Sequence, residues 1–481
     1  MAKVLLSFLG TGPLKKKEDL LKDATTPENI GEAIRAYRKA KYSLEGKIYE
    51  NRTFVASAIA DHHKVDKIFM IGTPKSMWEE VYNTFYNRSR PADKTLELSE
   101  DKASEDIWFE IQEHSQATDH NSPLEVPHKE EIEKEMGGGS KVVLIKYGIT
   151  EDEIRENITR ILQLEQCLQP GDELIVDITH AFRSLPLLIM SLLVYLKNVT
   201  SKNIKISHIY YGMNEVSGEM EDVSPIVDLK TMLELQDWII GAYDLKTYGN
   251  TYKIVELLTN SSMIHDGDKG VAKHLKDFSD YININYMDAM KKVPDSLKGI
   301  KDKCQNDLGK LIVNPVVNDF LKELGNKEFA SFSFLYRLAK WFYERKKYVQ
   351  AYLMASEAIF SYVCDKSGFT LRKNTDGSFC YVKNSIEYST VDIREGIRSL
   401  FNYNQDKIDP VLLPEFNQNS VELIRDTFKK HNPHRNHVAH LFGQRKEKYD
   451  GKKTEIKYGA TYSAMDIINV LESTLKDLSK L

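Results

Sequence analysis

Four of the chain's 13 histidines fall within one short segment, Lys429–His440, which has the sequence KKHNPHRNHVAH. His431, His434, His437 and His440 follow one another at intervals of three, a spacing that first suggests a metal site. However, Pro433 argues against one continuous helix through all four, and nine helical residues would turn His431 and His440 to opposite sides, through about 900°. The segment contains no HExxH motif and no nearby acidic ligand, so we expect no metal here.

A nucleolytic interpretation uses the same segment differently. Proline favours the first position of a helix, so a helix is predicted over 434–441, with Asn436 and His440 four residues apart on one face. Arg435 has a side chain long enough to reach the same place. A guanidinium group neutralises a phosphate and its transition state, and an imidazole transfers protons near neutral pH. RNA supplies its own nucleophile, the 2′-OH, so this pattern is typical of metal-independent phosphodiester cleavage.

The segment also belongs to a basic patch in a chain of net charge -5. Residues 429–453 hold six Lys and two Arg against one Glu and one Asp. The overall charge excludes a globally basic nucleic-acid binder, whereas the local excess suits a polyanionic substrate. A solvated basic helix end with capping histidines would explain the same residues without any activity.

A second set of reactive residues follows a predicted strand over 174–178. The strand leads into Thr179 and His180, and a helix is predicted to open at Ser184 after Arg183. A strand–turn–helix with free amides, a histidine and an arginine is suited to holding an anion. The alternative is a plain connection in which Asp177 caps backbone amides and Arg183 pairs on the surface.

The elements that would position these residues differ between the two halves of the chain. Up to about residue 228, short apolar strands alternate with helical patterns, which indicates a mostly parallel sheet covered on both faces. Ligands bind such sheets at the carboxyl ends of the strands. A helix is predicted over 151–168, and residues 90–140 are interpreted as a surface insertion. The predicted strands are 4–9, 68–71, 142–146, 174–178 and 206–211.

After residue 228 the strand signals almost vanish. Long helices are predicted over 231–258 and 331–364, and Asp-Gly pairs at 376–377 and 450–451 predict two β-hairpins. The predicted fold is therefore an α/β, Rossmann-like domain followed by a mainly α-helical domain with β-hairpin insertions. A composition of 41% hydrophobic residues, no apolar run of about 20 residues and four scattered cysteines favour a cytoplasmic chain without a membrane span.

Both sets of residues resemble known families. Arg435-Asn436-x-x-x-His440 resembles the Arg, four to six residues, His motif of HEPN ribonucleases, and the helix around Glu357 resembles the first core helix of that fold. The segment Asp177–Arg183 resembles the Asp-x-Thr-His-Gly signature of CRISPR-associated CARF proteins, with Ala181 replacing the glycine. Further segments resemble the same branch, namely Gly10-Thr11-Gly12, Ile71–Trp78 and Tyr210–Met213.

The paired resemblance implies an ancillary effector of type III CRISPR defence. It implies a CARF-like sensing domain over 1–228, a helical connector over 229–330 and a HEPN-like ribonuclease domain over 331–481. Cyclic oligoadenylate, with cyclic tetra-adenylate preferred, would bind the first domain and switch on cleavage of single-stranded RNA by the last. The alternative is a CARF regulator or scaffold with an inactive HEPN domain. We expect a homodimer or higher oligomer, because a two-fold axis would pair two His440 residues in one cleft.

The resemblance also selects candidate residues for each site. Arg435 would stabilise the phosphate, His440 would act as acid or base, and Asn436 would orient one of them. No cofactor and no metal are expected. Trp78 is a candidate for stacking an adenine, with core packing as its alternative. The complete set of ligand-binding candidates is Gly10, Thr11, Thr73, Ser76, Trp78, Thr179, His180 and Arg183.

Overall fold

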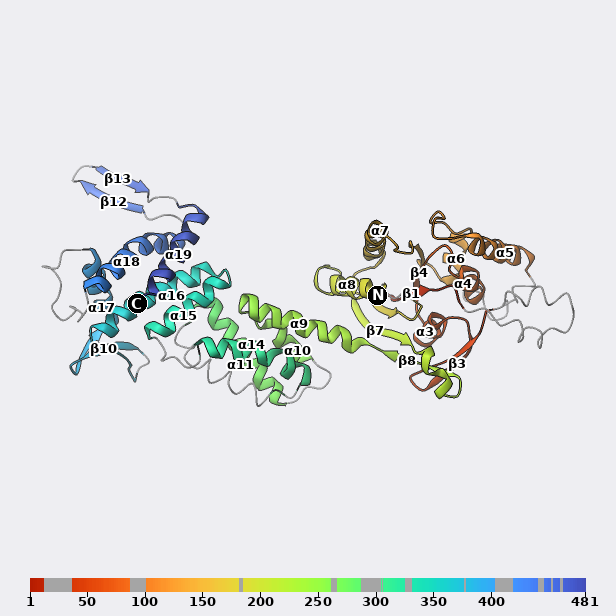
Figure 1. Cartoon of the computed structure of the whole chain (residues 1–481), viewed down its shortest axis with the longest axis horizontal. Helices are drawn as coiled ribbons and strands as arrows, with labels where there is room; N and C mark the ends of the chain where they lie inside the picture. The colour runs from red at the N-terminus through yellow and green to blue at the C-terminus, as the bar shows by residue number, and fades with distance from the viewer. Residues whose placement is uncertain are drawn as a thin grey trace. The chain divides into compact units, whose positions relative to one another are not determined.

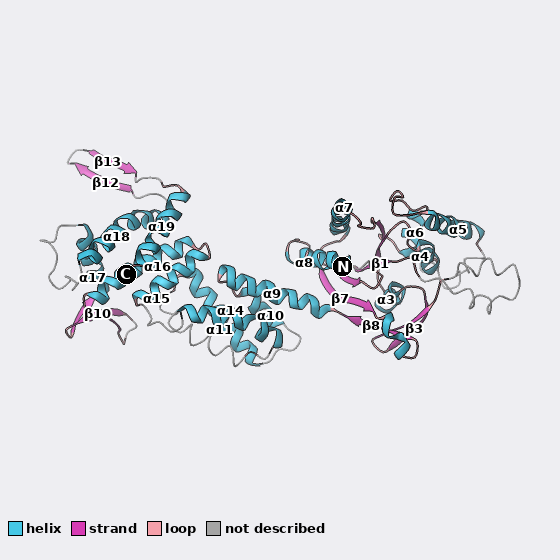
Figure 2. Cartoon of the chain, viewed as in Figure 1, coloured by secondary structure: helices cyan, strands magenta, loops and turns pink. Residues whose placement is uncertain are grey.

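The computed structural model divides the chain into two compact units, Met1–Glu234 and Leu235–Leu481 (Figure 1). Strands concentrate in the first unit and helices in the second (Figure 2). No helix among the described residues is long and apolar enough to cross a membrane. The structure describes residues 1–12, 37–86, 101–180, 185–260, 266–286, 304, 306–324, 331–375, 378–402, 418–439, 445–450, 453–458 and 462–481.

The first unit is built on one eight-stranded mixed sheet with the order β3-β2-β8-β7-β6-β1-β4-β5. Its five strands β7, β6, β1, β4 and β5 run parallel, as the near-continuous apolar runs predict, and they include all five strands expected from the sequence. The strands β2, β3 and β8 were not predicted. The strands are β1 (Lys3–Leu9), β2 (Ala40–Leu44), β3 (Lys47–Arg52), β4 (Lys67–Gly72), β5 (Lys141–Leu144), β6 (Glu173–Asp177), β7 (Lys205–Gly212) and β8 (Val223–Asp228).

Helices cover both faces of this sheet. Along β1 the buried side chains alternate, so that Leu5 and Leu9 enter one core and Val4, Leu6 and Phe8 enter the other. The first core is covered by α3, α4, α5 and α6, and the second by α7 and α8. These helices are α3 (Val55–His63), α4 (Trp78–Phe85), α5 (Lys102–Ala117), α6 (Lys129–Met136), α7 (Glu151–Leu162) and α8 (Leu185–Asn198).

The outer edge of β5 is capped by side chains. Glu133 accepts a hydrogen bond from the backbone N–H of Val142, and the Asn157 amide bonds both the N–H and the C=O of Lys146. An exposed row of backbone groups would otherwise offer a template for another strand. The capping side chains therefore end the sheet at β5.

Two sequence-based expectations for the first unit are wrong in detail. The described part of the predicted insertion over 90–140, residues 101–140, is not merely on the surface, because α5 and α6 place Ile111, Ile132 and Met136 in the core against α4. The helix predicted over 151–168 is α only to Leu162 and then tightens into a 3₁₀ turn, η3 (Gln163–Cys167). Another 3₁₀ turn, η4 (Asn214–Glu219), joins β7 to β8.

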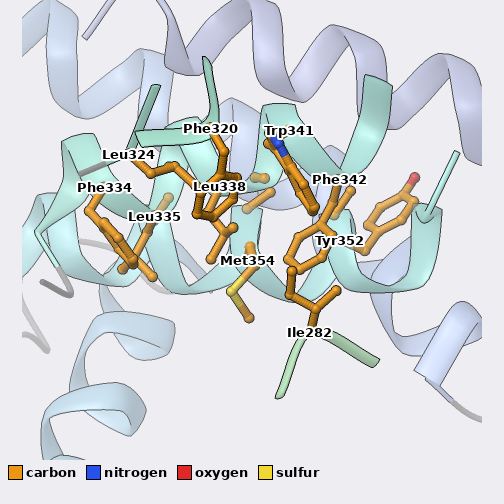
Figure 3. Packing of buried hydrophobic residues seen from close by; sticks show 14 of the residues in the cluster. Ile282, Phe320, Leu324, Phe334, Leu335, Leu338, Trp341, Phe342, Tyr352 and Met354 are labelled. Atoms are coloured by element: carbon orange, nitrogen blue, oxygen red, sulfur yellow. The ribbon is translucent and has the colours of Figure 1, made fainter. Parts of the chain in front are cut away.

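The second unit is mainly helical and has one large hydrophobic core. Trp341, Phe342 and Leu338 of α15 pack on Phe320 and Leu324 of α14 (Figure 3). This core includes residues on both sides of position 330, where the sequence analysis places a boundary. The helices are α9 (Lys230–Tyr248), α10 (Tyr252–Asn260), α11 (Asp266–Ile284), α14 (Asp307–Leu324), α15 (Phe332–Glu344), α16 (Tyr348–Lys366), α17 (Thr390–Asn402), α18 (Gln418–Ala439) and α19 (Ala464–Leu478).

Each of the two long helices predicted here is in fact a pair of helices. The pattern over 231–258 divides between α9 and α10, and the pattern over 331–364 divides between α15 and α16. Gly249 and Lys346 have positive φ angles at the two breaks, +66° and +59°. A continuous apolar periodicity hides such a break, because the antiparallel partner helix buries the same kind of face.

The predicted β-hairpins are present. Strands β9 (Thr370–Lys373) and β10 (Phe379–Lys383) pair antiparallel around the first Asp-Gly pair, which lies outside the described residues, and β11 (Ile386–Ser389) adds a third strand. Strands β12 (Arg445–Asp450) and β13 (Lys453–Tyr458) form the second hairpin.

The helix start predicted at Pro433 is wrong. Helix α18 runs without interruption through Pro433. A proline within a helix removes one backbone donor, here the one that would serve the carbonyl of Lys429. Packing of α18 against α16 and α19 outweighs this loss, and His431 anchors the turn just before the proline.

We predict that Gly249→Ala destabilises the second unit more than Gly368→Ala. Both glycines have positive φ, but a Cβ at 249 would lie 2.2 Å from the Trp341 ring, whereas nothing lies within 4 Å of a Cβ at 368. Strain plus overpacking should cost Gly249→Ala roughly 2–5 kcal/mol, and strain alone should cost Gly368→Ala roughly 1–2 kcal/mol. Urea unfolding of both variants measures the difference, and equal losses would contradict the packing argument.

Candidate functional sites

The strand order of the first unit places a switch point between β1 and β6. Among the five parallel strands, those that follow β1 in the chain are first β4 and β5 on one side of it and then β6 and β7 on the other. In open α/β sheets, ligands bind in the crevice at the carboxyl ends of the strands flanking such a point. The predicted segments Gly10–Gly12 and Thr179–His180 follow these two strands.

A buried carboxylate fixes the geometry at this point. Asp177 is fully buried at the end of β6, where it accepts a hydrogen bond of 2.6 Å from the Ser7 hydroxyl of β1. It also accepts bonds from the backbone N–H of Thr179, at 2.9 Å, and from the Thr179 hydroxyl, at 2.5 Å. The capping role that the sequence analysis gave to Asp177 as an alternative is thus present.

Five of the predicted ligand-binding residues line one cavity at the strand ends. The cavity has a volume of about 150 Å³, and its wall is completed by apolar side chains that include Ile145 and Leu185. Thr11 is exposed at its mouth, and Gly12 has a φ of +64° with no room for a Cβ beside Met77 and Tyr37. The five residues are Gly10, Thr11, Thr73, Ser76 and His180.

Two of these residues also hold the wall together. The Ser76 hydroxyl donates to the carbonyl of Leu9 at 2.7 Å and accepts from the backbone N–H of Thr73 at 3.0 Å. It therefore ties the end of β1 to the loop after β4. Thr73 and Ser76 are both 2% exposed, so little of either hydroxyl is accessible to a ligand in the cavity.

Two of the other candidates, Trp78 and Thr179, do not line this cavity. Trp78 is fully buried and donates its ring N–H to the carbonyl of Thr73, so in this structure the ring packs in the core and is not open to an adenine. The Thr179 hydroxyl is shared between Asp177 and the backbone N–H of Gly212 at 2.8 Å. Arg183 lies outside the described residues.

The sequence analysis missed the part played by α3. The backbone N–H of Val55, at the amino end of α3, donates to Nε2 of His180 at 3.4 Å. Burial lowers the pKa of His180, against the opposing effect of the Asp177 carboxylate. A neutral imidazole that accepts at Nε2 keeps its proton on Nδ1. No pattern in the sequence connects residues so far apart in the chain.

In the second unit the three described histidines of the cluster, His431, His434 and His437, do not converge on one place. His431 is buried, with Nε2 lying 2.8 Å from the Ser356 hydroxyl and 3.2 Å from the carbonyl of Tyr352. His434 and His437 instead face Tyr462, with ring centroids 3.9 and 5.5 Å away. Among the described residues no three His, Cys, Asp or Glu side chains are placed to hold a metal. His440 lies outside them.

Arg435 and Asn436 are adjacent and half-buried on α18, where the Arg435 guanidinium donates to the Asn436 amide oxygen at 3.2 Å. Glu357 of α16 lies close enough for the charge of Arg435 to act on it. Burial raises the pKa of Glu357, and Arg394, Arg435 and Arg398 oppose that shift. Arg394 and Arg398 were not among the predicted residues, although their spacing of four on one helix was a readable signal.

Comparison with known proteins agrees with the α/β architecture of the first unit. Residues 26–215 match the family model of the CARF domain of the CRISPR system endoribonuclease Csx1, and this part of the chain has a CARF-type fold. Residues 234–328 match the model of the second domain of CRISPR-associated protein MJ1674. That range nearly coincides with the segment 229–330 that the sequence analysis separates.

The chain is also similar to a curated protein along much of its length. It is 34% identical over 380 residues to CRISPR-associated protein MJ1674 of Methanocaldococcus jannaschii, an alignment that covers 76% of this chain. It spans about half of that relative, 54% of its length. A solved structure, Enterococcus italicus Csm6 bound to cyclic hexa-2′-fluoro-hexa-dAMP, aligns over 100% of this chain and 95% of its own, with a TM-score of 0.35 and 12% identity.

We predict that acid destabilises the second unit through His431. Burial lowers its pKa to about 3, whereas an unfolded histidine takes up a proton near 6.5. The stability that neutral His431 contributes is therefore full above pH 6.5 and is lost as the pH falls below it, by about 1.4 kcal/mol per pH unit.

Hydrogen exchange of α16 and α18 between pH 7 and pH 5, corrected for the intrinsic exchange rate, measures this loss. His431→Gln should flatten the pH dependence, and His437→Gln, on the same helix, should retain it. An unchanged slope in His431→Gln would show that another group is responsible.

Proposed function

We propose that this chain is a CRISPR-associated endoribonuclease that cleaves single-stranded RNA when a cyclic oligoadenylate binds its first unit. The observation that carries the proposal is the strand-end cavity at the switch point, which gathers five residues chosen from the sequence for anion binding. The match of this region to a CARF family model supports the same assignment. Cyclic tetra-adenylate is the activator we favour.

The cavity offers groups suited to an anionic nucleotide. The loop after β1 is exposed at Thr11 and glycine-rich, so its backbone can approach a phosphate closely. Neutral His180 can donate from Nδ1, and its position is set by α3. The cavity volume of about 150 Å³ suits part of one nucleotide, so the rest of the ligand would lie over the exposed loops.

Cleavage would take place around Arg435. Its guanidinium would neutralise the scissile phosphate and the charge that develops on it, while Asn436 holds the guanidinium in place. His440 would transfer the proton of the 2′-OH or of the leaving 5′-oxygen. Attack by the 2′-OH would leave a 2′,3′-cyclic phosphate and a 5′-OH, without a metal.

A second copy of the chain would complete the assembly. Helices α7 and α8 contact each other and expose an apolar surface, here called the α7–α8 face. Its exposed members are Ile154, Ile158, Leu162 and Leu187, and Leu187 is 73% exposed. Neighbouring exposed apolar side chains favour burial against another surface. The α7–α8 face is therefore our candidate for the two-fold interface.

We predict that the two candidate sites can be separated by mutation. In EDTA, cyclic tetra-adenylate should stimulate cleavage of a single-stranded RNA, and Arg435→Ala or His440→Ala should lower the stimulated rate by roughly 10²–10⁴. These two variants should still bind the activator. His180→Ala and Arg183→Ala should instead shift the activation midpoint to higher activator concentration, because a ligand activates only through its affinity for the active state.

Activator titrations of the four variants measure both effects. Full stimulated cleavage by His440→Ala would refute the catalytic assignment. An unchanged midpoint in both His180→Ala and Arg183→Ala would refute the sensing site. Activator binding by the wild type with no cleavage of any RNA would favour the regulator or scaffold.

We predict that Ile158→Asp weakens dimerisation, because a charge on the α7–α8 face would be desolvated at an interface. Sedimentation velocity at micromolar concentration should find a wild-type dimer and a dissociation constant raised roughly tenfold or more in the variant. Ile48→Asp is the matched control, since Ile48 is 54% exposed on the edge strand β3 and should not matter. An active wild-type monomer would exclude this dimer.

A further inference from the structure

Helix α17 presents two arginines to α16. Arg394 and Arg398 are four residues apart and so lie on one face of α17. Their guanidinium carbons lie 5.6 and 5.8 Å from the ring centroid of Phe360, a buried residue of α16. Contact with the same ring brings the two guanidinium groups together on one side of α16.

A single carboxylate lies among these cations. Glu357 precedes Phe360 by three residues, about one turn of α16, and its side chain accepts a hydrogen bond from Arg394. The charges of Arg394, Arg435 and Arg398 all act on this carboxylate. Three helices, α16, α17 and α18, therefore assemble one cluster, here called the Glu357 cluster, which consists of Glu357, Arg394, Arg398 and Arg435.

The charges in the Glu357 cluster do not cancel. Three guanidinium groups face one carboxylate, so the cluster stays positive whether or not Glu357 is protonated. Cys364 and Tyr381 are two titratable groups nearby; burial raises the pKa of both, that of Cys364 to about 12, so neither adds negative charge at neutral pH. Of the charged residues that the structure describes, none forms an ion pair with Arg398, which is exposed.

Such a cluster matches the charge of a nucleic-acid backbone. Arginine binds phosphate through a planar fork of donors, and it is more weakly hydrated than lysine. The ion pair with Glu357 fixes the direction of the Arg394 side chain. This side chain is still 39% exposed, so its guanidinium group can reach a ligand from the solvent. A fixed guanidinium loses less conformational entropy when a phosphate binds.

We propose that Arg394 and Arg398 bind phosphates of the RNA strand next to the phosphate held by Arg435. This inference rests on the proposed ribonuclease function and extends it by naming the path of the substrate across α17. Arg398 and Arg394 act as substrate-binding residues, and Glu357 positions Arg394. None of the three transfers a proton in the reaction.

The test is RNA binding by Arg398→Ala, since Arg398 is exposed and its loss leaves the bond between Arg394 and Glu357 intact. The probe is a short single-stranded RNA with 2′-O-methyl groups, which lacks the attacking hydroxyl, and binding is followed by fluorescence anisotropy over a salt series. We expect the affinity for the RNA to fall roughly 3- to 30-fold. The negative slope of log K against log salt should become shallower by about 0.7, the value for one phosphate contact. Arg398→Lys should keep the wild-type slope.

Arg372→Ala is the matched control. Arg372 is an exposed arginine of β9 that pairs with Glu387 and is not a member of the Glu357 cluster, and its removal should leave both affinity and slope unchanged. Kinetics with the activated enzyme add a second readout, in which Arg398→Ala should raise KM roughly 3- to 30-fold and leave kcat within about twofold, as expected for lost uniform binding.

The outcomes separate this inference from the proposed function. If Arg398→Ala binds RNA with wild-type affinity and slope, while Arg435→Ala abolishes cleavage, the path across α17 is wrong and the ribonuclease assignment stands. An equal loss of affinity in Arg372→Ala would also overturn the inference, because the effect would then be one of general charge. If Arg435→Ala and His440→Ala both cleave like the wild type, the proposed function itself fails.

Discussion

The first unit depends on the buried carboxylate of Asp177. A charge without solvent must satisfy its oxygens by hydrogen bonds, and Asp177 does so through Ser7 of β1 and through the backbone and hydroxyl of Thr179. These bonds lock the ends of two neighbouring strands together at the point where the strand order reverses. The Thr179 hydroxyl in turn accepts a hydrogen bond from the backbone N–H of Gly212, which connects β7 to the same group of contacts. His180 follows directly after this anchored turn, and α3 and Ser76 complete the support of His180 and of the cavity wall.

The second unit uses a buried imidazole in a comparable way. His431 joins α18 to α16 through Ser356 and Tyr352, just one turn before the arginine of the candidate catalytic pair. Because this contact holds α18 in the turn just before Pro433, and α18 also packs against α19, the helix continues where the proline alone would favour an end. Arg435 consequently lies within a supported helix, near its carboxyl end, and the Glu357 cluster forms on the α16 side of it.

Sequence reasoning succeeded where one local pattern decides the outcome. The five parallel strands, their helical connections and both hairpins follow from apolar runs and turn residues, and the strand-end rule located the cavity that contains Gly10 and His180. It failed where packing at a distance decides. Strands β2 and β3 are too polar for their pattern to stand out, and the burial of Trp78 is set by the helices around it.

The two candidate sites differ in the same respect. Four of the five candidate residues that line the strand-end cavity come from two short segments, 10–11 and 73–76. Short motifs in the sequence include such segments, so most of these residues could be selected from the sequence. The Glu357 cluster draws on three separate helices, α16, α17 and α18, and no spacing within the chain links residue 357 to residue 398. The helix that continues through Pro433 illustrates the same limit. The preference of proline for a helix start was considered without the contact of His431 with α16, which outweighs it.

The capped sheet edge has a consequence for how several such proteins coexist in one cell. Glu133 and Asn157 close the β5 edge, and charged residues with a left-handed Asn51 interrupt the β3 edge. Pairing of backbone groups between strands depends little on sequence. At these two edges it is therefore not available for association between copies. Association of copies at the edges of this sheet would then rely on side-chain surfaces, and these distinguish self from a close paralogue. A few substitutions on one helix face would then suffice to keep duplicated genes from forming mixed assemblies.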